Sequence, residues 1–303
     1  MKLRSWLAVC SSAVVTLLAL LALLALLACG ASDDSASRSS SGGGPPRDGA
    51  IVGPDGGVVE PDGGTASGRK VSTEHVTVLG AARDYVLSIP ATYEDGRKYP
   101  LVIALHGDGQ NADGFRDFLG LEPLVGNDAI VAYPDQASDL YTAYAENADQ
   151  QLIEAVITAA KAKLPIDAAK VWALGYSKGG FMANQIACRK PGLFTAMASH
   201  AAGAPEEPRG GDGYPQCPGV IGMPVMTSQG DGDQAIGAEY AAMYWASVNG
   251  CGSGRTATPP AGCQQFDGCP ADKGVTFCQA AGVFHYPIWG GAAQASWDFF
   301  KSL

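Results

Sequence analysis

Short apolar runs that end in glycine and polar residues are the feature that most constrains the fold of this chain. Leu101–Leu105 and Ala129–Tyr133 are apolar throughout, as is typical of strands buried on both faces. Further strands are expected at 171–174, 223–227 and 283–286, and helices at 149–164, 179–189, 240–248 and 297–303. Strands that alternate with amphipathic helices predict an α/β fold, with a mainly parallel central sheet and helices on both faces.

The segment 75–89 differs from these runs, because its apolar residues alternate in places with polar ones around a turn near Gly80. This pattern predicts an antiparallel hairpin. The polar clusters that follow the apolar runs fall at the carboxyl ends of the parallel strands, which is where such sheets bind ligands. We therefore expect the functional site along that edge of the sheet.

The first thirty residues have the pattern of an export signal. A basic start precedes an almost entirely apolar stretch from Leu7 to Leu27, and the ending Leu-Leu-Ala-Cys at 26–29 resembles the lipobox of bacterial lipoproteins. The resemblance implies a signal peptide over 1–28, cleavage before Cys29 and lipidation of its sulfur. The membrane would then be contacted through an N-terminal lipid anchor only. A retained transmembrane anchor is an alternative, because the apolar run is about 20 residues long, and ordinary secretion is another.

Residues 29–70 have the composition of a disordered tether. They include the sequence Ser-Ser-Ser-Gly-Gly-Gly-Pro-Pro at 39–46 and two Pro-Asp-Gly-Gly steps, at Pro54 and Pro61. Such a stretch has too few large apolar side chains to offset the entropy lost on ordering. The rest of the chain, 71–303, is long enough for one α/β domain with a sizeable core.

The charge of the chain argues against a nucleic-acid partner. The formal net charge is −10, and no run of clustered Lys and Arg is present. Binding to a phosphate backbone depends on such clusters. We therefore expect no nucleic acid among the partners.

The cysteines of the expected domain favour disulfides over a metal site. They are Cys188, Cys217, Cys251, Cys263, Cys269 and Cys278. An even number in an exported domain predicts up to three bridges, with fifteen possible connectivities. The spacing forms no paired Cys-x-x-Cys knuckles, and no nearby histidine completes a zinc set, so we expect no metal and no other cofactor.

The sequence Gly175-Tyr176-Ser177-Lys178-Gly179 fits the pattern G-x-S-x-G between an expected strand and an expected helix. In α/β-hydrolases this pattern is the nucleophile elbow, a strained turn that lifts the serine hydroxyl clear of the sheet. Gly175 and Gly179 are needed because larger side chains would collide across the turn. Ser177 is therefore the candidate nucleophile, and the backbone amide of Lys178 is a candidate donor to an oxyanion.

A serine hydroxyl needs a base that accepts its proton, and the four histidines of the chain limit the choice. His285 is the candidate base, because it alone comes late enough for the order Ser, acid, His of this fold. The acid should follow the strand that comes after the nucleophile helix, and we expect the run at 223–227 to be that strand. Asp231 and Asp233 both follow it, and spacing alone does not choose between them.

A second oxyanion donor is expected after the first central strand, where His106-Gly107-Asp108-Gly109 follows Leu105. Glycines on both sides allow the backbone to approach a substrate, and the amide of Asp108 is the candidate donor. His106 is expected to brace this turn and to take no part in proton transfer.

Several motifs along the chain resemble those of one group of enzymes. They include Tyr85–Pro90, Pro100–Gly107, Tyr133–Asp135, Gly175–Ala183, Cys188, Trp245, Asn249–Cys251, His285 and Ser296–Phe300. On these motifs the chain resembles the bacterial and fungal α/β-hydrolase esterases related to polyhydroxybutyrate depolymerases and feruloyl esterases. The resemblance covers nearly all of residues 80–303.

The resemblance implies roles for individual residues. The family's His-Gly-Thr-Ala-Asp aligns with 229–233, which makes Asp233 the catalytic acid, and His285 falls on the catalytic histidine. The family's Gly-Gly-His is here Val-Phe-His, a departure that bears on the local backbone and on substrate access. The family's Ser-Asn-Gly-Gly has Lys178 in place of Asn, which an amide donor tolerates. The resemblance also implies a Cys188–Cys217 bridge and pairings among the other four cysteines.

The implied activity is hydrolysis of a small-molecule or polymer ester through an acyl-enzyme. We expect the protein to be a monomer. Feruloyl or acetyl groups on polysaccharide are the first expectation for the substrate, and a polyhydroxyalkanoate ester is the alternative. A peptidase could use the same triad. In a different class, the chain would be a cell-surface binding lipoprotein whose triad is inactive.

Overall fold

The computed structural model describes residues 51–52, 58–59, 68–136, 147–233 and 237–303. The chain divides into two compact units, Met1–Asp62 and Gly63–Leu303. In the first, the described residues form a two-stranded antiparallel ribbon of β1 (Ile51–Val52) and β2 (Val58–Val59), which falls within the expected tether. The expected signal over 1–28 and Cys29 lie outside the described residues. Within the described ranges, no helix is both long and apolar enough to cross a bilayer.

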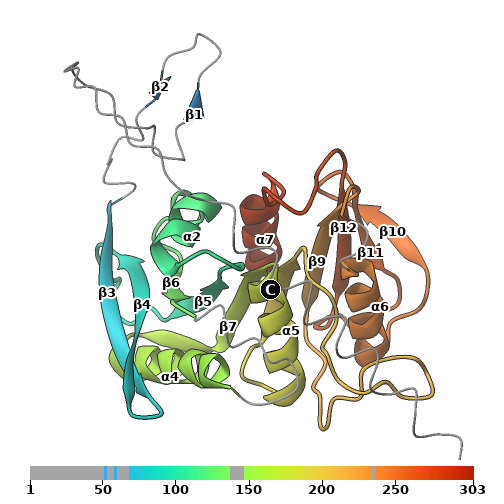
Figure 1. Cartoon of the computed structure of the whole chain (residues 1–303), viewed down its shortest axis with the longest axis horizontal. Coiled ribbons are helices and arrows are strands. Elements are labelled where there is room, and N and C mark those ends of the chain that lie inside the picture. Colours follow the sequence, from blue (N-terminus) through green and yellow to red (C-terminus); the bar gives the residue numbers. More distant parts are fainter. Residues whose placement is uncertain (1–50, 53–57, 60–67, 137–146, 234–236) are drawn as a thin grey trace, which may run out of the picture. The chain divides into compact units, whose positions relative to one another are not determined.

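The second unit is built on a ten-stranded sheet with the order β10-β11-β12-β9-β8-β7-β5-β6-β4-β3 (Figure 1). Its strands are β3 (Arg69–Val78), β4 (Ala81–Pro90), β5 (Tyr99–Leu105), β6 (Ile130–Pro134), β7 (Ile166–Tyr176), β8 (Ala196–His200), β9 (Val225–Gly230), β10 (Arg255–Thr258), β11 (Cys263–Phe266) and β12 (Val275–Ala280). The six strands from β12 to β6 are parallel, and antiparallel pairs extend the sheet at each edge. The expected hairpin at 75–89 is confirmed as β3 and β4.

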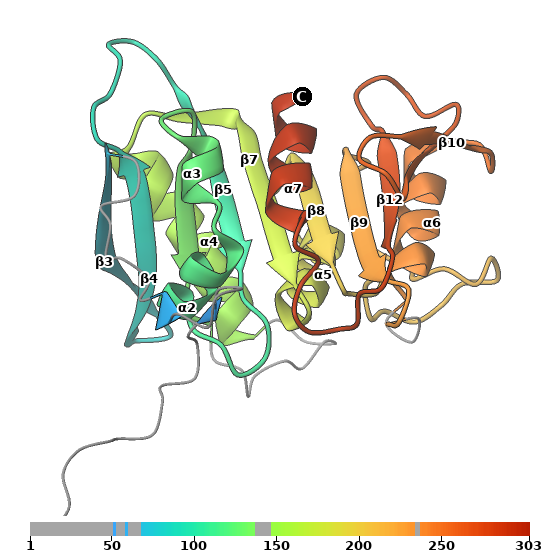
Figure 2. The same cartoon turned by 90° about the horizontal axis from the view of Figure 1, so that it is seen from above.

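Helices cover both faces of this sheet (Figure 2). Their bounds are α2 (Ala112–Leu119), α3 (Glu122–Val125), α4 (Ala148–Lys163), α5 (Lys178–Arg189), α6 (Ala238–Asn249) and α7 (Ala292–Lys301). Alternate residues of β5 enter opposite cores: Ile103 packs in the core shared with α4, α5 and α6, and Val102 in the core shared with α2, α3 and α7. The period of two along a strand produces this division. The predicted α/β-hydrolase fold, with a mainly parallel sheet covered on both faces, is confirmed.

Two strand predictions need correction. The strand at 223–227 is not the next one after the nucleophile helix, because β8 intervenes between α5 and β9. The expected last strand at 283–286 is a loop, and β12 is the last strand of the chain. Both edges of β12 are already paired, with β9 and with β11, so the following segment has no edge there to join.

All six cysteines of the domain are in disulfides. Cys188 in α5 is bonded to Cys217, as the resemblance implied. The other four form Cys251–Cys269 and Cys263–Cys278, and the second of these joins directly opposed positions of β11 and β12. These last two bridges lie at the antiparallel edge of the sheet, where strands β10 and β11 are short.

Loss of the Cys251–Cys269 bridge should destabilise the fold. The bridge joins residues 18 apart, so replacing both cysteines with alanine should lower the free energy of unfolding by about 3 kcal/mol. This pair suits the test because both residues are only partly buried, whereas Cys263 and Cys278 are buried and would also leave a cavity. Urea unfolding measures the change. A loss below about 0.5 kcal/mol would contradict the expected role of the bridge.

Candidate active site

The candidate nucleophile Ser177 lies at the junction between β7 and α5, at the carboxyl end of a central strand. Its backbone has φ 52° and ψ −123°, a conformation that non-glycine residues rarely adopt. The Ser177 N–H donates to the carbonyl of His200 at the end of β8 (2.9 Å), and the Ser177 carbonyl accepts from Phe181 N–H (3.0 Å). Hydrogen bonds on both sides hold the strained turn in place.

The two glycines of the motif allow close backbone contacts around this turn. A Cβ atom at Gly175 would lie 2.4 Å from the carbonyl oxygen of Gly179. A Cβ atom at Gly179 would lie 2.1 Å from the carbonyl oxygen of Leu105. Real Cβ atoms do not approach backbone this closely, so helix α5 can start directly behind the serine only because both positions are glycine.

Ser177, His285 and Asp233 form a continuous hydrogen-bonded chain. The Ser177 hydroxyl lies 2.8 Å from His285 Nε2, and His285 Nδ1 lies 2.7 Å from Asp233 Oδ2. An ionised carboxylate only accepts, so Nδ1 carries the proton and Nε2 of the neutral ring accepts from the serine. The Asp233 side chain is 11% exposed and the imidazole 40%, so the carboxylate is shielded while the ring remains accessible.

Asp231 has a different position from Asp233. Its Oδ1 accepts from the Gly282 N–H (2.9 Å), and its own N–H donates to the carbonyl of Ala280 (3.0 Å). Asp231 thus joins the end of β9 to the loop that follows β12. The structure brings Asp233, and not Asp231, to the imidazole.

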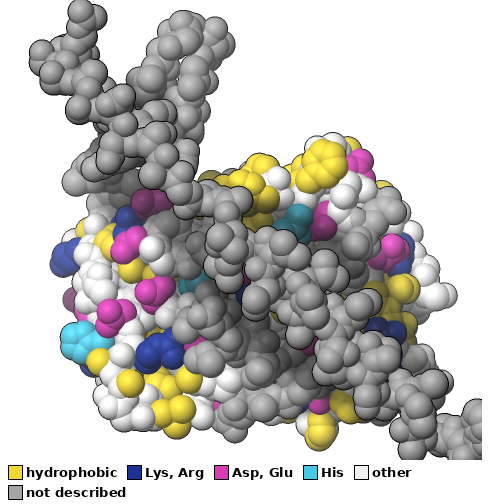
Figure 3. Space-filling view, viewed as in Figure 1, with side chains coloured by type: hydrophobic (Ala, Val, Ile, Leu, Met, Phe, Trp, Pro, Cys, Tyr) yellow, Lys and Arg dark blue, Asp and Glu magenta, His cyan; other side chains and the backbone are white. Residues whose placement is uncertain are grey.

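Aromatic side chains surround the loop that carries His285. The Tyr176 hydroxyl donates to the main-chain carbonyl of His285 (2.5 Å), and the two rings stack with centroids 5.8 Å apart. Burial raises the pKa of Tyr176 to about 12, with further contributions from Tyr286 and Asp233, so the hydroxyl keeps its proton and remains a donor. Tyr286 stacks on Phe118 of α2 (5.7 Å). Figure 3 shows exposed hydrophobic side chains beside a histidine on this face.

The turn after β5 lies against the nucleophile. A Cβ atom at Gly107 would lie 3.3 Å from the Cβ atom of Ser177. The Gly107 N–H already donates to Gln110 Oε1 (3.0 Å), which favours Asp108 as the amide that this turn offers to an oxyanion. Lys178, the first residue of α5, has its N–H at the positive end of the helix. The side chains of Asp108 and Lys178 form an ion pair (2.6 Å) that links the two candidate donor segments.

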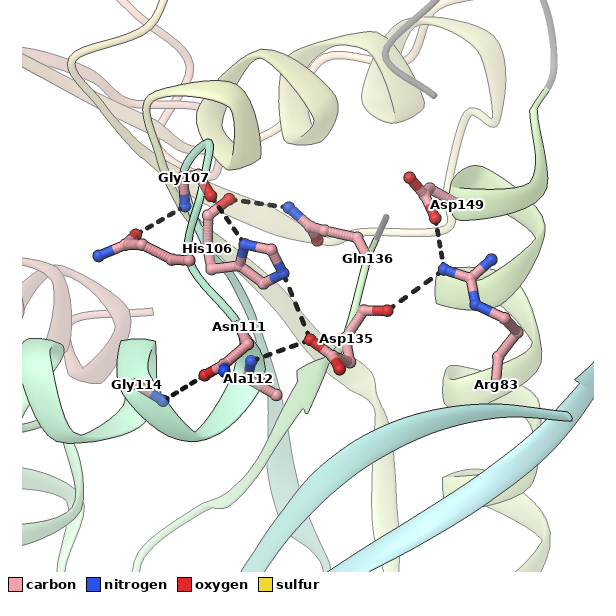
Figure 4. A network of polar contacts seen from close by, with 10 residues as sticks. Arg83, His106, Gly107, Asn111, Ala112, Gly114, Asp135, Gln136 and Asp149 are labelled. Carbon is pink, nitrogen blue, oxygen red and sulfur yellow. Dashed lines mark hydrogen bonds and ion pairs between the residues drawn. The ribbon is translucent and has the colours of Figure 1, made fainter. Parts of the chain in front are cut away.

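His106 braces this turn, as expected (Figure 4). Its buried ring lies 2.8 Å from the carbonyl of Gly107 and 3.8 Å from Asp135 Oδ1, and its own carbonyl accepts from Gln136 Nε2 (2.8 Å). The network continues through Arg83, which donates to the carbonyl of Asp135 (3.2 Å). These contacts connect the end of β5 to the end of β6.

The imidazole of His200 is fully buried and is not part of the hydrogen-bonded chain from Ser177 through His285 to Asp233. Ser296 Oγ donates to the carbonyl of Ala292 (2.7 Å), so His200 Nε2–H donates to Ser296 Oγ (2.7 Å). His200 Nδ1 then accepts from the hydroxyl of Ser228 (2.6 Å). Burial lowers the pKa of His200 to about 4, so the ring is neutral and joins β8, β9 and α7.

The neutral state of His200 predicts a pH dependence of stability. Its pKa is lower in the folded chain than in the unfolded chain, so the unfolded state binds a proton first as the pH falls below about 6.5. Stability is therefore complete above this pH and declines toward pH 4, with a loss of about 2 kcal/mol between pH 7.5 and pH 5. Urea unfolding at several pH values measures the decline. A His200→Gln variant should lose most of this slope, and an unchanged slope would contradict the assignment.

The chain is similar in sequence to known feruloyl esterases. It is 30% identical over 237 residues to a probable feruloyl esterase C of Aspergillus terreus, a match that covers 72% of this chain and 83% of that protein. Feruloyl esterase C of Emericella nidulans is 28% identical over 235 residues, covering 73% and 84%. The family model of the prolyl oligopeptidase family matches residues 137–204, which include the nucleophile turn. The chain belongs to the feruloyl esterase-like α/β-hydrolases.

Two solved esterase structures have a fold similar to that of this chain. The acetyl xylan esterase of Aspergillus awamori has a TM-score of 0.56 and 19% identity, over 76% of this chain and 99% of that one. A CE1 ferulic acid esterase of Anaeromyces mucronatus has a TM-score of 0.53 and 15% identity, over 80% and 93%. At these identities the likeness shows the shared fold. The sequence relatives, together with this fold, show that the feruloyl esterase-like chain is a serine hydrolase that acts on carboxylic esters.

The feruloyl esterase-like chain also holds site residues that its sequence did not point to. Tyr176 occupies a variable position of G-x-S-x-G, yet its hydroxyl fixes the main chain at His285. Gln136 binds the carbonyl of His106 from the loop after β6. Neither could be found from a motif, because both act through contacts between segments far apart in the chain.

Proposed function

We propose that this feruloyl esterase-like chain is an exported serine esterase that uses Ser177, His285 and Asp233 as a catalytic triad. The hydrogen-bonded chain from Ser177 Oγ through the imidazole to Asp233 Oδ2 is the observation that carries the proposal. A serine hydroxyl at 2.8 Å from an imidazole nitrogen is in position to lose its proton as it attacks. The shielded carboxylate orients the ring and stabilises its cation.

The reaction proceeds in two acyl-transfer steps. His285 Nε2 takes the proton of Ser177 as Oγ bonds to the ester carbonyl carbon, and the amides of Asp108 and Lys178 hold the oxyanion. His285 then gives this proton to the leaving alcohol as its C–O bond breaks, which produces the acyl-enzyme and the free alcohol. His285 then takes a proton from water as the water oxygen attacks the acyl-enzyme, and it returns this proton to Ser177 Oγ as the acyl–Oγ bond breaks and the acid is released.

Feruloyl or acetyl esters of polysaccharide are the proposed substrates. The sequence relatives carry the name feruloyl esterase, and a structural neighbour carries the name acetyl xylan esterase. A panel of methyl ferulate, an acetylated xylo-oligosaccharide, a 3-hydroxybutyrate oligomer and a peptide p-nitroanilide tests the choice. We expect the highest kcat/KM on the ferulate or acetyl ester. A preference for the hydroxybutyrate oligomer would replace this substrate class with polyhydroxyalkanoates, and a preference for the anilide would replace it with peptides.

Export and lipidation at Cys29 complete the proposal. Three disulfides are typical of proteins that fold outside the cytosol. In a bacterial host, the wild-type chain should be recovered with the membranes, with a mass that corresponds to a lipidated Cys29 at the N-terminus. A Cys29→Ser variant should lose the lipid mass. A wild-type chain that keeps residues 1–28, or that is cut elsewhere, would contradict lipidation.

A further inference from the structure

Two exposed aromatic side chains lie on either side of His285. Phe284 is 69% exposed and Tyr286 is 67% exposed. Among the described large hydrophobic residues, only Leu79, at a hairpin turn, is more exposed. Exposed apolar side chains that cluster often mark a binding surface, whereas single exposed apolar residues usually do not.

Both rings are fixed in place by packing on one side. The Phe284 ring lies over Gly232, where a Cβ atom would come within 2.7 Å of the ring. Tyr286 stacks on Phe118 with ring planes 5° apart and centroids 5.7 Å apart. Because each ring is held and still largely exposed, it offers a surface that loses little conformational freedom when a ligand binds.

The position of His285 decides which part of an ester meets these rings. The imidazole passes the serine proton to the leaving alcohol, so the alcohol oxygen must come within hydrogen-bond distance of Nε2. The carbonyl oxygen lies instead toward the donors at Asp108 and Lys178. The alcohol portion of the bound ester therefore extends from the reacting carbon toward His285, next to Phe284 and Tyr286.

We propose that Phe284 and Tyr286 form a platform that binds the sugar ring carrying the ester. A sugar ring packs its C–H face on an aromatic ring while its hydroxyl groups stay in water, which suits an open platform. A wholly apolar alcohol would favour an enclosed pocket. The inference rests on the proposed esterase function and specifies its alcohol side.

Two esters of the same acid, one with a sugar as its alcohol and one without, distinguish an effect on sugar binding from an effect on acyl binding. The test compares kcat/KM for a feruloylated arabino-xylo-oligosaccharide with kcat/KM for methyl ferulate in the purified protein and its variants. In Phe284→Ala and in Tyr286→Ala, the ratio of the two values should fall about tenfold, mainly through KM for the oligosaccharide. Tyr286→Phe and Phe284→Tyr keep a ring and should restore the wild-type ratio. Tyr93 is an exposed aromatic residue that precedes β5, at the end of this strand away from Ser177. The Tyr93→Ala variant therefore serves as the control.

The outcomes distinguish this inference from the proposed function. Wild-type protein that hydrolyses neither ester, nor the acetylated xylo-oligosaccharide, would remove the esterase proposal and the platform with it. If the wild type hydrolyses these esters and both alanine variants keep its ratio of the two kcat/KM values, the platform alone would be overturned. An equal loss on both esters would also overturn it, because the rings would then act on the shared acyl group. A tenfold lower ratio that the ring-retaining variants restore supports it.

Discussion

Ser177→Ala should lower kcat on a soluble feruloyl or acetyl ester by about 10⁴- to 10⁶-fold, since no other group can form the acyl-enzyme. The fold should persist, because alanine removes one oxygen from a partly exposed position and meets the same backbone conformation as serine. Initial rates with the purified variant measure the loss, and unfolding in urea checks that the protein remains folded. Turnover within about tenfold of the wild type would remove Ser177 from the mechanism.

Asp233→Asn should lower kcat by about 10⁴-fold. An amide in place of the carboxylate can donate a hydrogen bond to Nδ1, which favours the tautomer that carries its proton on Nε2. That tautomer cannot accept from Ser177, and the amide no longer stabilises the imidazolium. The loss should appear in kcat more than in KM.

Asp231→Asn is the matched control for Asp233→Asn. Both aspartates lie in the same short loop after β9, but Asp231 Oδ1 accepts from the Gly282 N–H and an asparagine oxygen can keep this bond. The Asp231→Asn variant should therefore lose less than about tenfold in kcat. A larger loss in Asp231→Asn than in Asp233→Asn would reverse the assignment of the acid.

The sequence was sufficient to predict the parallel sheet and to single out Ser177 and His285, which lie within hydrogen-bond distance of each other in the structure. Apolar runs predicted the central parallel strands, because strands buried on both faces need apolar side chains throughout. Ser177 and His285 followed from the steric demands of the turn and from chain order. Both predictions depend on local geometry or on the order of residues along the chain, and a single sequence contains that information.

The choice between the two aspartates needed tertiary contacts. Gly232 N–H donates to the carbonyl of Val283, so the acid loop runs beside the histidine loop and directs one carboxylate inward. The resemblance to known esterases pointed to Asp233, whereas spacing alone could not.

The missed and misplaced strands have related causes. β8 contains Ser199 and His200, polar residues that are unexpected in a buried strand. Both are buried because partners satisfy them: Ser199 accepts from Asn184 Nδ2 (2.9 Å), and His200 bonds to serines on β9 and α7. The apolar residues at 283–286 indicated a strand, but two of them are exposed at the site. Hydrophobic patterns alone do not separate burial in a core from exposure at a binding surface.

A fluorophosphonate probe followed by peptide mass spectrometry tests the triad most directly, because the probe forms a stable bond only with an activated serine. We expect one phosphonyl group per chain, on the peptide that contains Ser177, and much slower labelling in the Asp233→Asn variant. An active enzyme that carries the adduct on another residue, or that is not labelled at all, would contradict the role of Ser177 as the nucleophile.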